Sequence, residues 1–371
     1  MRPIFVGAAV GAILAIPGLV RAGDPWLLFE TRPRAPFVLA SDGRFEALVG
    51  VEVRNTAERA VRVEALRVDE LARGAVVATR EDATDLFRSA GLVSDPSVDP
   101  GSSAAWTGLC LALDSEAVDG VRFTFDLVQW RGWRRVRTRQ TLEFAVRRPD
   151  VFPLLALPVQ GPWRITQGHG CATRHRQGGL GGEFSWDFAA VHEAGRAGDP
   201  KRKITGRNAD SPTFGRPVVA PVSGVVVSVV DGEDDNDERE DFPRRSLVDS
   251  LRRPLWIFGN HVVLEHEGVF VLLAHLQKGS LTVRRGDAVA EGQPIARAGN
   301  SGNSMRPHLH LQVMDRADPA APGVSGLPAR LKDYMEVTVR GEGDGRETSM
   351  RRVAAGDPPE GALVIAGADP P

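Results

Sequence analysis

The chain has 371 residues, of which 42% are hydrophobic and 25% charged, and its formal net charge is −2. This length and composition allow two soluble domains with buried cores. The near-neutral charge argues against nucleic acid as a partner, because nucleic-acid binding normally requires a basic surface. Cys110 and Cys171 are the two cysteines of the sequence, which allows one disulfide or two separate buried thiols but no zinc–cysteine site.

The N-terminal segment has the pattern of an export signal. Arg2 precedes a largely apolar run over residues 4–20, and small residues surround a cleavage point after Ala22. Pro17 interrupts the run, which is also short for a membrane span of about 20 residues; an uncleaved anchor is the alternative. We expect residues 1–22 to be a signal peptide. The protein is then exported to the periplasm or cell envelope, or secreted, without stable membrane insertion.

Residues 23–148 consist of short strand-like runs separated by turns. The runs lie at residues 45–53, 61–68, 109–113, 121–125 and 141–146. Strands at this spacing, without helical periodicity, predict a β-sandwich, and their rhythm resembles that of immunoglobulin-like accessory domains. A short helix is expected within residues 80–90. No histidine precedes His169 and the carboxylates are scattered, so we interpret this domain as a spacer or binding module.

A proline-bounded linker at residues 148–153 leads into a second domain, predicted over residues 149–338. It is also mainly β, with strands expected at residues 183–188, 217–221, 224–230, 261–265, 269–276 and 309–314.

Polar stretches interrupt these strands at residues 192–213 and 231–254, and we expect them to frame a substrate groove. The acidic run at residues 233–238 lacks the spacing of a calcium loop and is predicted to be solvated. Residues 339–371 are predicted to be a loose tail, in which only residues 362–365 are strand-like.

The residues that can carry chemistry lie at a few points of the second domain. A glycine-rich turn at residues 299–307 leads into an alternating run in which His308, His310 and Gln312 share one face. A hydrophobic strand ends at His275, and alternation puts this residue on the face of Val271 and Leu273. Asp187 lies between aromatic residues of another strand, where a carboxylate is costly to bury without a partner.

Four segments together resemble the lysostaphin/LytM-type zinc metallopeptidases of family M23, which cleave peptidoglycan peptides. They are His175 with Asp187-Phe188, the run at 217–226, the run from 259–264 to 274–276 with 283–295, and the turn at 299–303 leading to Pro307-His308-Leu309-His310. The resemblance covers about residues 160–314 and implies a LytM-type antiparallel β-sheet peptidase domain behind the immunoglobulin-like sandwich.

The resemblance implies a role for each polar residue of these segments. His175, Asp187 and His310 correspond to the three protein ligands of a catalytic Zn²⁺ with an open fourth position. His275 and His308 correspond to the two histidines that are not ligands, one acting as general base and both able to stabilise the tetrahedral intermediate. We favour His308 as the base, because it lies two residues from a ligand on the same strand face.

Asn260 also matches a recurrent family position. It either orients a ligand or substrate, or is a turn residue. His192, His261 and His266 have no such match, and we expect no metal role for them.

Two features depart from the family pattern. Eleven residues separate His175 from Asp187, where many members have three, and His169 is therefore the alternative ligand. Leu273 occupies the position where many members have a tyrosine two residues before the middle histidine, and the single tyrosine of the chain is Tyr334.

The resemblance predicts an exported zinc endopeptidase that hydrolyses peptide bonds in peptidoglycan cross-links or stems. The alternative is a non-enzymatic LytM-type regulator of a cell-wall amidase, and a further possibility is a peptidase for a protein substrate such as a Gly-rich chain. The family's regulators usually lack a metal or catalytic residue, whereas all five positions are filled here. The bond cleaved and the oligomeric state do not follow from the sequence.

Overall fold

The computed structural model describes residues 25–32, 36–41, 44–84, 86, 97–148, 151–169, 175, 180–191, 207–236, 254–321, 323–340 and 347–366. The predicted signal peptide and His192 lie outside these residues, as do most of the expected helix at 80–90 and large parts of both polar stretches. Within the described part the chain is mainly β, as predicted, and its helical elements there are the 3-10 turns Asn208–Asp210 and Pro254–Phe258. No helix in this part is long and apolar enough to cross a membrane.

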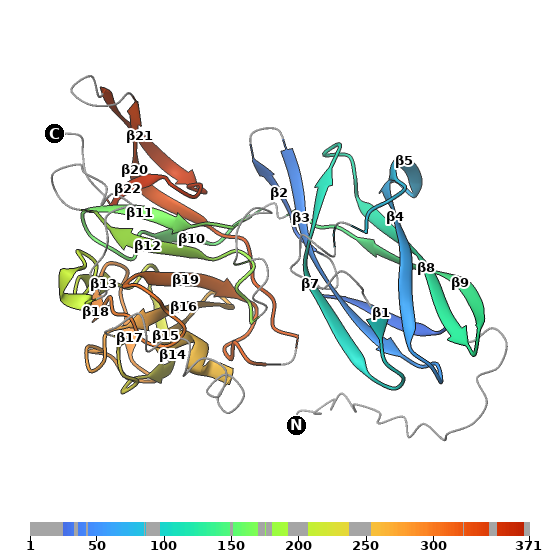
Figure 1. Cartoon of the computed structure of the whole chain (residues 1–371). Coiled ribbons are helices and arrows are strands. Elements are labelled where there is room, and N and C mark those ends of the chain that lie inside the picture. Colours follow the sequence, from blue (N-terminus) through green and yellow to red (C-terminus); the bar gives the residue numbers. More distant parts are fainter. Residues whose placement is uncertain are drawn as a thin grey trace, which may run out of the picture.

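The N-terminal part consists of two antiparallel sheets that share one core (Figure 1). The four-stranded sheet contains β1 (Leu27–Arg32), β2 (Val38–Ser41), β3 (Arg44–Asn55) and β7 (Ser103–Leu113). The five-stranded sheet contains β4 (Val61–Ala72), β5 (Ala75–Arg80), β6 (Ser97–Val98), β8 (Gly120–Arg131) and β9 (Arg134–Ala145). Every second residue of the strands faces inward, so that Val49 and Val51 meet Phe123 and Phe125 in the core. The predicted sandwich is present; its immunoglobulin-like character stays a prediction.

The second part is built on one eleven-stranded sheet in the order β10-β20-β22-β11-β12-β19-β16-β15-β14-β17, with β21 paired to β20. A small second sheet pairs β13 (Pro217–Val219) with β18 (Pro294–Arg297). The strands of the large sheet are β10 (Leu154–Ala156), β11 (Pro162–Gln167), β12 (Trp186–Ala190), β14 (Gly224–Val230), β15 (Asn260–His266), β16 (Val269–Leu276), β17 (Ala288–Val289), β19 (Leu309–Met314), β20 (Arg330–Arg340), β21 (Glu347–Gly356) and β22 (Leu363–Ala366).

The centre of this sheet has two different faces. Alternation on β12 and β19 sends Trp186, Phe188, Leu309 and Leu311 into the main core. The residues between them face the other way, and strand pairing sets Asp187 directly opposite His310. Strand β16 lies on the other side of β19, with Ala274 opposite His310. This second face also carries a smaller apolar cluster that includes Ala274, and the Asp187–His310 pair lies beside it.

The face predicted for His275 is wrong. Simple alternation puts it with Val271 and Leu273, which lie in the main core. At this point β16 carries a bulge, because three residue steps on β16 match two on β15. His275 also has a left-handed backbone, with φ of 60°. A bulge combined with positive φ re-aims a side chain, and it turns the ring of His275 toward the face that carries Asp187.

The C-terminal segment is not a loose tail. Strand β20 runs across the predicted boundary at residue 338, β21 pairs with its outer edge, and β22 lies between β20 and β11. Val364 of β22 is fully buried against the main core. The tail has weak hydrophobic periodicity, and its strands are stable because they complete a sheet that already has a core.

An aromatic pair connects the sandwich with the second part of the chain. The ring of Phe37, beside β2, packs edge-on against Phe184 at a centroid distance of 6.0 Å.

Cys110 of β7 is half-buried and disulfide-bonded. The other cysteine of the sequence, Cys171, lies outside the described residues.

Candidate metal and catalytic centre

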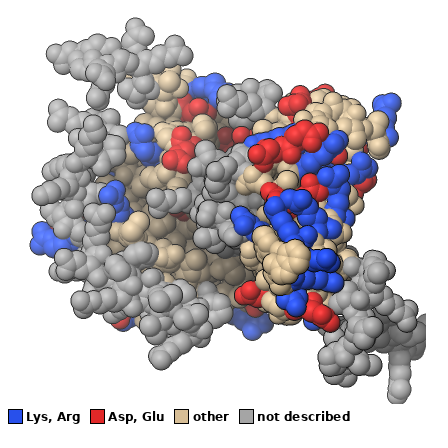
Figure 2. Space-filling view, turned by 45° about the vertical axis from the view of Figure 1, so that its right-hand side comes forward, with Lys and Arg blue, Asp and Glu red and all other residues tan. Residues whose placement is uncertain are grey.

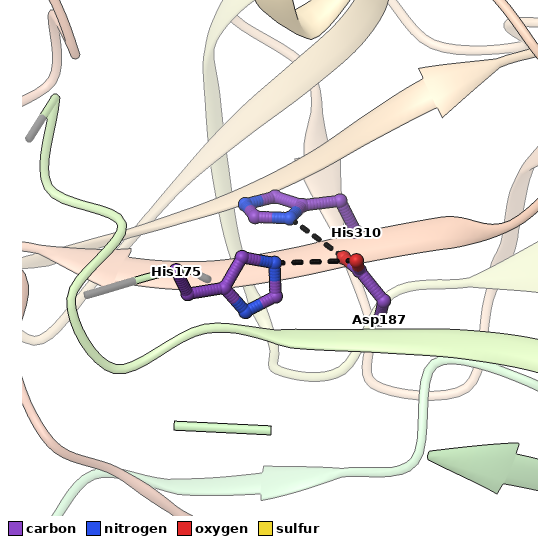
Figure 3. A group of neighbouring side chains, drawn as sticks. All are labelled: His175, Asp187 and His310. Atoms are coloured by element: carbon purple, nitrogen blue, oxygen red, sulfur yellow. Dashed lines mark hydrogen bonds and ion pairs between the residues drawn. The ribbon is translucent and has the colours of Figure 1, made fainter. Parts of the chain in front are cut away.

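Three predicted ligands meet on the second face of the sheet. His175 Nε2 lies 3.2 Å from Asp187 Oδ2, and His310 Nδ1 lies 2.9 Å from Asp187 Oδ1 (Figure 3). The three ligand atoms lie within 4.8 Å of one another, a spacing that suits a common metal ion. Strands β12 and β19 fix Asp187 and His310 relative to each other, while His175 comes from the segment between β11 and β12.

The hydrogen bonds of the two imidazoles fit a cation at this point. His175 Nδ1 lies 3.2 Å from the carbonyl of Gly168 and 3.1 Å from that of Ser185, which leaves Nε2 facing the Asp187 carboxylate. His310 likewise has acceptors at both nitrogens, Asp187 at Nδ1 and Gln312 Oε1 at Nε2. A neutral imidazole has only one N–H, so a neutral ring that donates on its far side turns a lone pair toward Asp187, where a cation could bind both the lone pair and the carboxylate. Two imidazole nitrogens and a carboxylate are donors that Zn²⁺ accepts.

The electrostatics of the cluster keep Asp187 ionised. Burial alone would raise the pKa of this carboxyl, but the charges of His308 and His175 and hydrogen bonds from His175 and His310 hold it well below its ordinary value. Burial favours neutral His175, yet the Asp187 carboxylate outweighs this effect and raises the pKa of the imidazole. The site thus holds a buried negative charge.

His308 and His275 lie beside the cluster with their rings 4.5 Å apart. His308 Nδ1 is held by the carbonyl of Arg306 at 2.8 Å, and its Nε2 lies 3.7 Å from Asp187 Oδ2. His275 Nδ1 donates to the carbonyl of Ser301 at 2.9 Å. In both rings the carbonyl accepts a hydrogen bond from Nδ1–H, so in the neutral form of each ring Nε2 carries the lone pair.

The surroundings of His275 strongly perturb its pKa. Burial, together with repulsion from His308 and His310, places its pKa well below the ordinary 6.5, so that the ring is neutral at neutral pH. Its positive φ is unusual for a non-glycine residue and costs on the order of 1–3 kcal/mol. Backbone strain of this kind is found at functional sites, where the surrounding structure holds it in place.

A buried polar network supports the glycine-rich turn from which His308 emerges. Asn236 Nδ2 contacts the carbonyl oxygens of Asn300, Gly302 and Ser304 at 2.8–3.0 Å. Ser304 Oγ in turn lies 3.1 Å from His308 Nδ1.

Asn236 belongs to the acidic run that we predicted to be solvated, yet it is buried. Asp235, next to it, accepts the backbone N–H of Asn300. No signal in the sequence separates Asn236 from its charged neighbours.

His169 lies outside the cluster of His175, Asp187 and His310. It forms an ion pair with Asp357, and its ring packs against Trp186 at 5.0 Å. Asp357 lies between β21 and β22, so this pair ties the ligand-bearing region to the C-terminal strands. The geometry favours His175 as the third ligand.

Asn260, His261 and His266 form hydrogen bonds with backbone groups. Asn260 exchanges hydrogen bonds with the backbone of Glu233 and donates to the carbonyl of Leu276, which fixes a turn. His261 Nδ1 is hydrogen-bonded to the carbonyl of Gly259, and His266 Nδ1 to that of Ser223.

Leu273 and Tyr334 lie in the main core. No described contact brings Tyr334, the single tyrosine of the chain, to the cluster.

Comparison with known proteins identifies the C-terminal part. A family model described as Peptidase family M23 matches residues 203–322, which include His275, His308 and His310. The chain is 33% identical over 133 residues to the peptidoglycan DD-endopeptidase ShyB of Vibrio cholerae, covering 35% of this chain and 27% of ShyB. It is 31% identical over 70 residues to ShyA of the same organism, covering 19% of this chain and 16% of ShyA. The matches thus span less than a third of either relative.

Among solved structures, the catalytic domain of the prophage-encoded M23 protein EnpA from Enterococcus faecalis is 19% identical. The alignment covers 47% of this chain and 94% of that chain, with a TM-score of 0.28. The catalytic domain of lysostaphin from Staphylococcus simulans is also 19% identical, covering 43% and 85%, with a TM-score of 0.24. Residues 203–322 of this chain thus match the model of peptidase family M23, and two peptidoglycan DD-endopeptidases are similar to parts of the chain.

Proposed function

We propose that the protein is an exported, zinc-dependent endopeptidase that hydrolyses peptide bonds in peptidoglycan cross-links or stems. The observation that carries the proposal is the cluster of His175, Asp187 and His310 with two further imidazoles beside it. The matched relatives are named peptidoglycan DD-endopeptidases, which supports the same substrate class here. Periplasmic or cell-envelope localisation, and a positioning role for the β-sandwich, belong to the same proposal.

The geometry of the cluster gives each of its residues a separate role in the proposed reaction. His175 Nε2, His310 Nδ1 and one carboxylate oxygen of Asp187 would hold the metal. Zinc supplies a Lewis acid that polarises the scissile carbonyl and increases the acidity of water. His308 Nε2 has a free lone pair close to Asp187 and would take the proton from the attacking water.

His275 would provide a second nitrogen, Nε2, that takes part in proton transfer. Because its ring is neutral, its Nε2 would accept the second proton of the attacking water from the tetrahedral intermediate, while His308 returns the first proton to the leaving amine as the C–N bond breaks. The tyrosine that many members have near this position is Leu273 here and faces the core. Stabilisation of the oxyanion would therefore fall to the imidazolium that His308 becomes on taking the water proton, together with the metal.

The rival function is that of a non-enzymatic regulator of a cell-wall amidase. A regulator has no need for a complete donor set, nor for the strained backbone that aims His275 at the cluster. Both features support the enzyme.

Purified sacculi treated with the zinc-loaded protein test the proposal by muropeptide analysis. We expect new fragments with free peptide ends from the intact protein and none from His310→Ala, with at least a hundredfold loss of rate in His308→Ala. His266→Ala is the matched control, because this histidine lies on the same sheet and bonds a loop carbonyl away from the cluster. Absence of new fragments from intact, zinc-loaded protein would overturn the proposed peptidoglycan endopeptidase.

A further inference from the structure

The β8–β9 hairpin of the sandwich ends in a tight, well-defined tip. Strand β8 stops at Arg131 and β9 starts at Arg134, so Gly132 and Trp133 form a two-residue turn. Gly132 has φ of 63° and Trp133 is not among the residues with positive φ. This is the pattern of a type II′ turn, whose twist matches that of the strands. The tip is therefore held in one conformation by the ladder behind it.

Two tryptophans are exposed at this tip. Trp133 is 84% exposed and Trp130 is 54% exposed. Neither belongs to the core of the sandwich, which is filled by residues such as Phe123 and Phe125. Large aromatic side chains are among the groups that gain most from leaving water. Two exposed tryptophans within four residues of one hairpin tip indicate an interaction surface.

The same tip has an excess of positive charge. Arg131 and Arg134 lie directly opposite each other across the strands, and neither makes an ion pair within the described part of the chain. Like charges in this position are destabilising unless something compensates them. Arg135 and Arg137 share the single carboxylate of Glu64. Figure 2 shows Lys and Arg side chains gathered over the exposed face of the sandwich.

Guanidinium groups also flank the indole rings. Arg134 lies over the ring of Trp133 at 5.4 Å, and Arg135 over that of Trp130 at 5.9 Å. This arrangement suits a lipid interface, where the indole enters the headgroup region and arginine binds phosphate. A sugar-binding platform needs amide or carboxylate groups for the hydroxyls, and the tip residues 130–135 contain none.

We propose that the β8–β9 hairpin tip, residues 130–135, binds the surface of an anionic phospholipid bilayer. The hairpin tip fits a flat surface, and its positive charge complements phosphate headgroups. Binding is peripheral and requires no membrane-spanning segment. In Figure 1, β8 and β9 lie on the side of the sandwich away from β12 and β19. A protein held by this tip keeps its metal cluster away from the lipid surface. The proposal is independent of the proposed hydrolytic activity.

Vesicle sedimentation of residues 23–371 tests this proposal. Without residues 1–22, the apolar run at 4–20 cannot itself enter lipid. We expect binding to vesicles that contain phosphatidylglycerol, weaker binding as salt increases, and little binding to pure phosphatidylcholine. The double substitution Arg131→Gln/Arg134→Gln should lower partitioning roughly 30-fold, since each basic side chain near the surface contributes about fivefold. Trp130→Ala/Trp133→Ala should also abolish most binding.

Matched variants separate the tip from general charge. Arg284→Gln/Arg285→Gln removes the same charge from an exposed site on the other domain and should bind as the wild type does. Arg131→Lys/Arg134→Lys keeps the charge and should retain most binding, which excludes misfolding as the cause of any loss. Equal binding by the glutamine and wild-type proteins, or no binding by the wild type, would overturn the proposal. If the tip variants lose binding to sacculi but not to vesicles, the ligand of the tip is a glycan rather than a lipid.

Hydrolysis of a soluble cross-linked muropeptide should be unchanged in all tip variants. Failure of the lipid proposal and failure of the proposed peptidase activity are therefore distinguishable in the same set of proteins.

Discussion

Gln312 Oε1 accepts a hydrogen bond from His310 Nε2 at 2.9 Å, while Gln312 Nε2 donates to the carbonyl of Leu180 at 3.0 Å. The second bond fixes which end of the amide faces the imidazole. A neutral His310 ring then carries its proton on Nε2 and presents the Nδ1 lone pair on the side of Asp187. A polar residue behind a metal-binding histidine commonly sets its tautomer in this way.

Gln312→Ala is expected to weaken zinc binding by about 10-fold or more, because the His310 ring loses the acceptor that orients it. Competition with a chromogenic zinc chelator measures the change. Gln312→Glu keeps an acceptor in place and should retain or increase the affinity. Gln293→Ala, at an exposed turn of the same domain, is the control and should bind zinc normally. Unchanged affinity in Gln312→Ala would remove this residue from the metal centre.

Asn236→Ala should lower the free energy of unfolding by about 1–3 kcal/mol, because buried carbonyls of the glycine-rich turn lose their donor. Turnover should fall further than stability accounts for, since Ser304 of that turn contacts His308. Zinc affinity should be unchanged. Chemical denaturation and kinetics of folded protein measure the two effects.

Asp234→Ala provides the matched control. Asp234 is two residues away and forms an exposed ion pair with Lys278, so its loss should change stability by less than about 1 kcal/mol. Equal effects of the two substitutions would contradict a specific role for Asn236.

His275 should make stability depend on pH below its ordinary pKa of 6.5. As pH falls through this value, the unfolded chain binds a proton at His275 while the folded chain does not, so unfolding becomes more favourable. The loss is at most about 1.4 kcal/mol per pH unit and continues down to the lowered folded pKa. Denaturation of metal-free protein at pH 8 to 5 measures it.

His275→Gln is the comparison, because glutamine does not titrate. The pKa of His175 is raised and contributes with the opposite sign, but it is present in both proteins and largely cancels. A difference between wild type and variant that stays constant with pH would show that His275 is not buried in the neutral form.

Truncation after Arg340 should destabilise the peptidase domain by at least about 3 kcal/mol, because burial of Val353 and Val364 is lost. It also exposes the edge of β11 and removes Asp357, the partner of His169. Solubility, thermal unfolding and zinc binding report the loss. Removal of residues 367–371 alone should leave all three unchanged.

Alternation in the sequence predicted which way the site's side chains face on those strands whose backbone is regular. Asp187 on β12 and His310 on β19 face the same side because both strands follow the period of two, and pairing sets them opposite each other. The strands of the sandwich were predictable for the same reason. The proximity of His175 to these two residues was predicted from the family resemblance. His175 lies outside the strands, so side-chain alternation does not predict where it points.

The features that escaped prediction depend on tertiary structure. His275 faces the site because of a bulge and a positive φ, which alternation does not contain. Asn236 is buried because the glycine-rich turn offers it three carbonyls, although its sequence neighbours are charged. Strands β21 and β22 lack a strong pattern of their own and form because β20 and β11 provide partners.

The position of β22 has a consequence for how the protein is made. This strand follows the other described strands of the sheet along the chain, yet it lies inside the sheet between β20 and β11 rather than at an edge. The β11 edge therefore lacks this partner until β22 has been synthesised, and β12 with Asp187 is paired to β11. The sheet that carries Asp187 and His310 is complete only once β22 has been added, so a chain that stops before β22 cannot assemble it in full.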